Sequence, residues 1–131
     1  MKTRIPRETK VRHINLSRRT APCPKCGTVG KRHSNRTRRL REIGISAPSI
    51  LVIIYSSHYC PKCDKHFTLP MEHLAAPRAR FTNRVRKTAV DLVIRESMTL
   101  DKAMTRMRHK YLVHVPPTTI HDWVVEEMKI D

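Results

Sequence analysis

Acidic residues are scarce in this sequence, and their scarcity sets its charge. Only 11 Asp and Glu stand against 27 Lys and Arg, so the formal net charge is +16 with every histidine neutral. An excess of one sign opposes compact folding unless a polyanion neutralises it. We therefore expect the chain to bind a polyanion, and nucleic acid is a better candidate than an anionic membrane surface.

Long apolar segments are lacking as well. No run comes near the roughly 18 apolar residues of a membrane span. The basic N-terminus is not followed by the apolar segment of a secretory signal. We therefore expect no membrane partner and a reducing, cytoplasmic location, associated with the nucleoid if the ligand is DNA.

The motifs of common enzyme active sites are also missing. The sequence contains no Gly-rich phosphate loop, no G-x-S-x-G and no evident set of three metal-binding carboxylates. We therefore expect that this chain is not an enzyme.

Aromatic residues make up only 5% of the 131 residues. A chain of this length forms one ordinary domain or two very small ones. So few rings support only a modest core, and small modules with a modest core commonly use a bound metal ion for stability.

The four cysteines occur as two identical C-P-K-C pairs, Cys23 with Cys26 and Cys60 with Cys63. Two redox disulfides of the C-x-x-C type would be unusual in a small basic chain in a reducing compartment. Four thiolates instead complete the tetrahedral shell of Zn²⁺ and leave no position open for water. The pattern predicts one structural Zn²⁺, with iron or a redox role as less favoured alternatives. His58 and His66 are predicted to be surface or supporting residues rather than ligands.

The chain divides into three regions. Residues 1–20 carry seven basic residues and one acid without a regular period, which predicts a basic flexible arm. Residues 21–70 predict a zinc ribbon, in which Gly27 takes the positive φ of a metal-binding turn. A basic strand over 36–43, a turn at Gly44 to Pro48, a buried strand over 50–55 and a closing strand over 66–68 complete the ribbon.

From Pro77 onward the apolar period becomes helical. Pro77 suits the first turn of a first helix, and Thr99 suits the N-cap of a second. The pair Pro116-Pro117 suits the start of a third helix, which follows the second after a tight link. The inward side of the first helix is predicted to carry Phe81, Val85, Ala89, Leu92 and Val93, and that of the third Ile120, Trp123, Val124 and Met128. Residues 77–131 thus predict a helix-turn-helix domain, and the whole chain an α+β fold.

Basic residues cluster in the ribbon and in the first helix, with few acids between them. Their density favours phosphate contacts, and the polar start of the third helix could reach base edges. The candidate DNA contacts are Arg36, Arg38, Arg39, Arg41, Arg78, Arg80, Arg84, Arg86, Lys87, Thr118, Thr119 and His121. Residues 111–131 contain four acids and a single basic residue, Lys129. The last helix is therefore also a candidate surface for a protein partner or a dimer.

Several motifs occur in an order that is typical of one family. They are C-P-K-C-G at 23–27, His33, R-L-R-E-I at 39–43 and Y-C-P-K-C-D-K-H-F at 59–67, then Pro77, Arg80, Thr82, T-T-I at 118–120 and Trp123. Over residues 21–130 the chain resembles the N-terminal region of ISL-three-type insertion-sequence transposases. The resemblance implies a zinc ribbon and a helix-turn-helix that recognise the terminal inverted repeats of a transposon.

In that family a separate RNase-H-like domain with three acidic residues and Mg²⁺ performs catalysis, and this chain ends where such a domain would begin. The resemblance therefore implies DNA recognition without catalysis, either by a fragment of a transposase or by a short protein that keeps only the DNA-binding half. Two other hypotheses remain open from the sequence. One is a small zinc-ribbon protein that binds RNA, for example on a ribosome, and the other is an adapter in a transposition or transcription complex.

Overall fold

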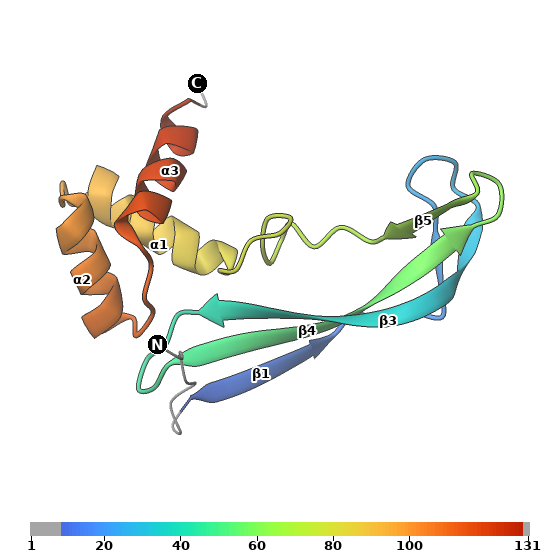
Figure 1. Cartoon of the computed structure of the whole chain (residues 1–131), viewed down its shortest axis with the longest axis horizontal. Coiled ribbons are helices and arrows are strands. Elements are labelled where there is room, and N and C mark those ends of the chain that lie inside the picture. Colours follow the sequence, from blue (N-terminus) through green and yellow to red (C-terminus); the bar gives the residue numbers. More distant parts are fainter. Residues whose placement is uncertain (1–8, 130–131) are drawn as a thin grey trace.

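The computed structural model describes residues 9–129, which form a curled five-stranded sheet followed by three helices (Figure 1). This confirms the expected α+β class. The strands are β1 (Lys10–Asn15), β2 (Thr20–Pro22), β3 (Val29–Glu42), β4 (Ser49–Cys60) and β5 (Lys65–Thr68). The helices are α1 (Asn83–Ile94), α2 (Leu100–Lys110) and α3 (Pro117–Met128).

The long strands β3 and β4 form the antiparallel centre of the sheet, with Leu40 opposite Leu51 and Arg38 opposite Ile53. β2 extends the sheet beside β3, while β5 and β1 both pair with β4 at different points along it. The basic strand, the buried apolar strand and the closing strand that the sequence predicts are therefore confirmed.

β1 corrects the prediction that residues 1–20 form a flexible arm. Residues 10–15 pair in parallel with β4, and Ile14 packs beside Leu51 and Ile53. Of the six side chains of β1 only that of Ile14 is half-buried, and the other five are exposed. A strand with one inward side chain needs no regular alternation of apolar and polar residues, so its sequence gives little sign of a strand. The part of the predicted arm at residues 1–8 lies outside the described residues.

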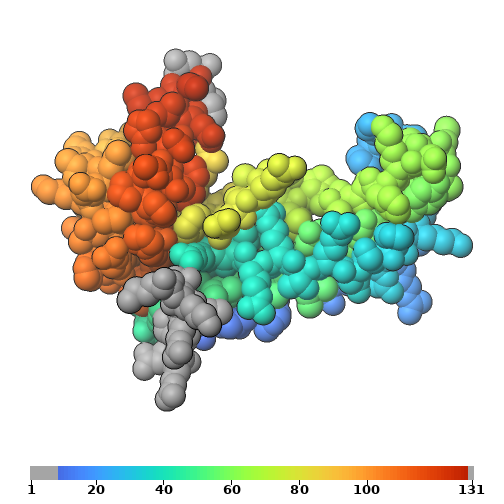
Figure 2. Space-filling view, in the orientation of Figure 1, coloured from blue at the N-terminus to red at the C-terminus, as the bar shows by residue number. Residues whose placement is uncertain are grey.

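A connecting segment, residues 69–82 and here called the strap, runs from β5 back over one face of the sheet to α1 (Figures 1 and 2). This covered face carries Ile14, Leu40, Leu51, Ile53 and Tyr55. The strap packs Met71, Leu74, Ala75 and Ala79 against it. Because side chains alternate along a strand, the neighbouring residues of the same strands lie on the opposite, open face: Val11, His13, Asn15, Thr37, Arg39, Arg41, Ile50, Val52 and Ile54.

The three helices bury a second core at one end of the sheet, built on Val85, Ala89, Met107, Val115 and Ile120. Thr99 caps α2 with its side chain, as predicted. The first helix begins at Asn83 rather than near Pro77, because Thr82 provides its N-cap. The inward prediction for Met128 is wrong, since 68% of this residue is exposed.

The connections within this helical core also differ from expectation. Phe81 precedes α1 instead of lying on it, and its ring meets Trp123 edge to face with 5.5 Å between centroids. The link between α2 and α3 spans residues 111–116 and is longer than a tight turn. Leu112 adopts a φ of 55° there, while Val113 and Val115 turn inward. The link therefore contributes two side chains to the core.

The sheet and the helices are joined by hydrogen bonds at the end of β3. Glu42 is buried, and its carboxylate accepts from the Thr82 hydroxyl at 2.8 Å and from the Ile43 N–H at 2.8 Å. The Arg41 backbone also bonds to Arg80 and Thr82. The only acid in the five strands thus holds the N-cap of α1 in place.

We expect Thr82→Val to destabilise the protein by about 2–3 kcal/mol, because valine removes the helix cap and leaves the buried Glu42 carboxylate with only the Ile43 N–H as donor. Thr99→Val is the matched control, since Thr99 caps α2 at an exposed position and its loss should cost about 1 kcal/mol. Urea unfolding followed by circular dichroism measures both. Equal losses for the two variants would contradict a special role for the Glu42 bond.

Candidate metal centre and basic surface

The four cysteines lie in the β2–β3 and β4–β5 connections, which meet at the end of the sheet farthest from the helices (Figure 1). Cys23 directly follows β2 and Cys60 ends β4, so the sheet pairing brings the two loops together. In the first loop the Gly27 N–H donates to the Cys23 carbonyl at 2.8 Å, and Gly27 has the expected positive φ of 76°. In the second loop the Cys63 N–H lies 3.4 Å from the Cys60 sulfur. Such N–H groups stabilise a thiolate.

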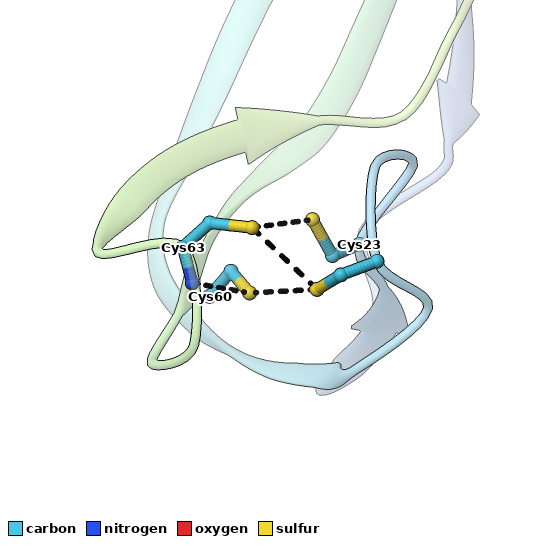
Figure 3. A group of neighbouring side chains, drawn as sticks. Cys23, Cys60 and Cys63 are labelled. Carbon is cyan, nitrogen blue, oxygen red and sulfur yellow. Dashed lines mark hydrogen bonds between the residues drawn. The ribbon is translucent and has the colours of Figure 1, made fainter.

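The four sulfur atoms point toward one another from the two loops (Figure 3). The Cys26 sulfur lies 3.5 Å from the sulfurs of both Cys60 and Cys63, and the Cys23 and Cys63 sulfurs are 4.0 Å apart. All four sulfur atoms lie within 4.8 Å of one another. Metal–sulfur bonds of about 2.3 Å in a tetrahedron require sulfur separations of about 3.8 Å. The separations are far too long for disulfide bonds. The cluster therefore fits a four-coordinate metal ion.

Hydrogen bonds shift the pKa values of Cys23, Cys26 and Cys63 in different directions. The hydroxyl and backbone of Thr28 lower the pKa of Cys26 to about 6, and backbone N–H groups of Cys26 and Lys25 lower the pKa of Cys23. Hydrogen bonds with the sulfurs of Cys26 and Cys60 raise the pKa of Cys63 to about 12. A divalent ion would favour the thiolate form of all four cysteines, because its charge offsets the repulsion among thiolates.

The two histidines near the second loop have different surroundings. His58 is fully buried, stacks on Phe67 and places Nε2 3.1 Å from the Arg18 carbonyl. It is therefore not a surface residue but supports the strand that leads to Cys60. His66 is exposed and lies 4.5 Å from the His33 ring between centroids. Neither histidine belongs to the four-cysteine group.

The structure separates the four predicted arginines of β3 onto two faces. Arg39 and Arg41 are exposed on the open face. Arg36 is exposed on the other side of the strand, opposite Tyr55. Arg38 is half-buried there, and its guanidinium donates to the carbonyls of Ala76 and Ala79 in the strap, the latter at 2.9 Å. Arg38 thus holds the strap on the sheet.

The remaining predicted contacts lie along the strap and the helices. Arg78 and Arg80 are exposed in the strap, and Arg84 and Lys87 are exposed on α1. Arg86 forms an ion pair of 2.6 Å with Glu126, which ties α1 to α3. The start of α3 carries Thr118, Thr119 and His121, of which the first and last are exposed. These residues do not form one patch with the cysteine cluster, which lies at the other end of the sheet.

Sequence reasoning missed the basic and polar side chains that β1 adds to the sheet. Arg12 and His13 belong to adjacent positions of an edge strand, so they lie on opposite faces. The signal that could have found them is the run Lys10 to Asn15, which contains a short alternation around Ile14. Such a short run predicts pairing only when the partner strand is known.

Three comparisons were made, with protein-family models, with curated proteins and with solved structures, and none found a match. Among residues 9–129, none of the helices has the length and apolar character needed to cross a membrane.

Proposed function

We propose that this protein is a DNA-binding module in which a zinc ribbon and a helix-turn-helix hold one duplex. The Zn²⁺ ion would be bound by Cys23, Cys26, Cys60 and Cys63 and would act as a structural ion. Four sulfur ligands suit Zn²⁺ and leave no coordination position for substrate. Cys23 and Cys60 are buried, which further separates the ion from solvent.

The observation that carries the proposal is the uncompensated positive charge of the sheet. Its five strands contain nine Lys and Arg against one acid, and that acid, Glu42, is buried in the junction with α1. Within the described part of the chain, the three ion pairs all lie in the helical region. The exposed β3 arginines Arg36, Arg39 and Arg41 therefore keep their full charge for a ligand, and regularly spaced phosphates suit such a surface.

The helices add a second point of contact. In a helix-turn-helix the N-terminal turn of the last helix meets base edges. Thr118 and His121 are exposed at this position, whereas Glu126 and Glu127 lie two turns later and would repel phosphates. The proposal therefore assigns only the first turn of α3 to the groove. The terminal repeats of a transposon, which the family resemblance implies, are one class of site that such a module would recognise.

The proposal predicts that the zinc-loaded protein binds duplex DNA with strong salt dependence. Titration of labelled duplexes by fluorescence anisotropy should give a linear fall of log affinity with log salt, with a slope that reflects about 4–8 phosphate contacts. A structured RNA of equal length is the competitor, and a selected duplex should be preferred over it. Equal or tighter binding of the RNA would support the ribosome-type hypothesis instead and would contradict a DNA-specific function.

A further inference from the structure

The open face of the sheet has a distinct composition across its three strands. Arg39, Val52 and His13 form one row across β3, β4 and β1, and Arg41, Ile50 and Val11 form the next. A third row contains Thr37, Ile54 and Asn15. The face therefore has a central apolar line, an arginine border on β3 and a polar or small border on β1, and none of its nine residues is acidic.

Within residues 9–129 neither hydrophobic cluster includes the apolar residues of the open face. The strap covers the opposite face, and the helical core lies beyond the end of the sheet. On the central line Ile50 and Ile54 are half-buried and Val52 between them is buried, while Val11 on the β1 border is 49% exposed. Three partly exposed apolar side chains on one sheet face, those of Val11, Ile50 and Ile54, are typical of a surface that contacts another molecule.

The charges decide which molecule fits this face. A second copy placed face to face would bring four open-face arginines, Arg39 and Arg41 of each chain, into one interface to which neither open face adds an acid. A duplex offers phosphates to the arginines and apolar sugar edges or thymine methyl groups to the isoleucines and valines. Arg39 and Arg41 are two residues apart on one strand, about 6.8 Å, which corresponds to about two nucleotide steps along a duplex.

We infer that the open face, and not the strap-covered face, lies against the DNA duplex, with Arg39 and Arg41 contacting phosphates and β1 forming part of the contact surface. This inference rests on the proposed DNA-binding function and specifies its surface. It removes Arg38 from the contacts, because its guanidinium is engaged by the carbonyls of Ala76 and Ala79. It also gives β1 a role in binding.

The test compares two double variants with the same net charge. Arg39→Gln with Arg41→Gln removes both open-face arginines. Arg12→Gln with Arg36→Gln removes two exposed arginines from the opposite side of the sheet, one on β1 and one on β3. The first variant should bind duplex DNA at least about tenfold more weakly at moderate salt and lower the salt slope by about 2. The second should change the slope by less than about 0.5.

A second pair of variants introduces one acid each. Val11→Asp places a carboxylate on the open face, while Ile45→Asp places it on the β3–β4 turn, where Ile45 is 90% exposed. Only Val11→Asp should weaken DNA binding. Circular dichroism and the zinc content should match the wild-type protein for all four variants, which separates loss of contact from loss of fold.

The outcomes separate the inference from the proposed function. If the wild-type protein binds no duplex, the proposed function fails. If the wild-type protein binds but the two double variants lose affinity equally, the inference is overturned while the function stands. A wild-type dimer in sedimentation that Val11→Asp converts to monomer would assign the open face to a second copy and would also overturn the inference.

Discussion

Replacing Cys60 by serine is expected to abolish zinc binding and to unfold the cysteine end of the sheet, residues 20–34 and 57–68, while the helices stay folded. This end contributes no residue to either hydrophobic cluster of the described chain, both of which lie elsewhere. Its two cysteine loops meet at the four sulfurs. Structural zinc sites in small modules contribute about 10–16 kcal/mol of apparent binding energy at neutral pH. Loss of one ligand should therefore outweigh every other single contact in this region.

Zinc content per chain and hydrogen exchange measure this prediction. The wild-type protein should carry one zinc ion, and Cys60→Ser should carry almost none. Peptides from β2 and β5 should lose protection in the variant, whereas peptides from α1 to α3 should keep it. His66→Asn is the matched control, because His66 is an exposed potential ligand three residues after Cys63. It should retain the metal and the protection.

Two results would contradict the zinc assignment. Full zinc content in Cys60→Ser would show that other groups bind the ion. Equal exchange protection in the metal-free and zinc-loaded wild-type protein would show that the ion does not stabilise this end of the sheet. Removal of zinc by a chelator gives the same comparison without a substitution.

The parts of the fold that the sequence predicted are those governed by local chemistry. The spacing of Cys23 to Cys26 and of Cys60 to Cys63 predicts the cluster, because a C-x-x-C loop places two sulfurs on one side of a turn. Thr99 and the Pro116-Pro117 pair predict helix starts for equally local reasons. In each case a few neighbouring residues determine the geometry.

The parts that the sequence did not predict depend on contacts between distant segments. β1 pairs in parallel with β4, 39 positions later in the chain, and its own residues carry little pattern. Thr82, and not Pro77, marks the start of α1, and its hydroxyl also donates to Glu42, 40 residues earlier, which fixes this helix start to the sheet. Arg38 and Arg39 are neighbouring arginines on opposite sides of β3. Only the folded structure shows that the strap covers the side of Arg38 and accepts hydrogen bonds from its guanidinium. The charge count could therefore predict a polyanion ligand, but it could not assign arginines to a surface.

After the loss of the metal site, the next largest effect is expected from Ile120→Ala, which should lower the free energy of unfolding by about 2–5 kcal/mol. Ile120 is fully buried and belongs to the core that joins α3 to α1 and α2. Truncation to alanine removes apolar contacts and leaves a cavity that a close-packed core fills only in part. The loss should appear as a lower urea midpoint, measured by circular dichroism at 222 nm.

Met128→Ala is the matched control for this prediction. Both residues lie on the apolar side that the sequence predicts for α3, but 68% of Met128 is exposed, so its truncation should change stability by less than about 0.5 kcal/mol. Because Ile120 anchors the turn that presents Thr118 and His121, its truncation should also weaken duplex binding under conditions where the protein is still folded. Equal destabilisation by the two variants would mean that α3 packs with a different side inward. Its first turn could then not face a DNA groove in the proposed way.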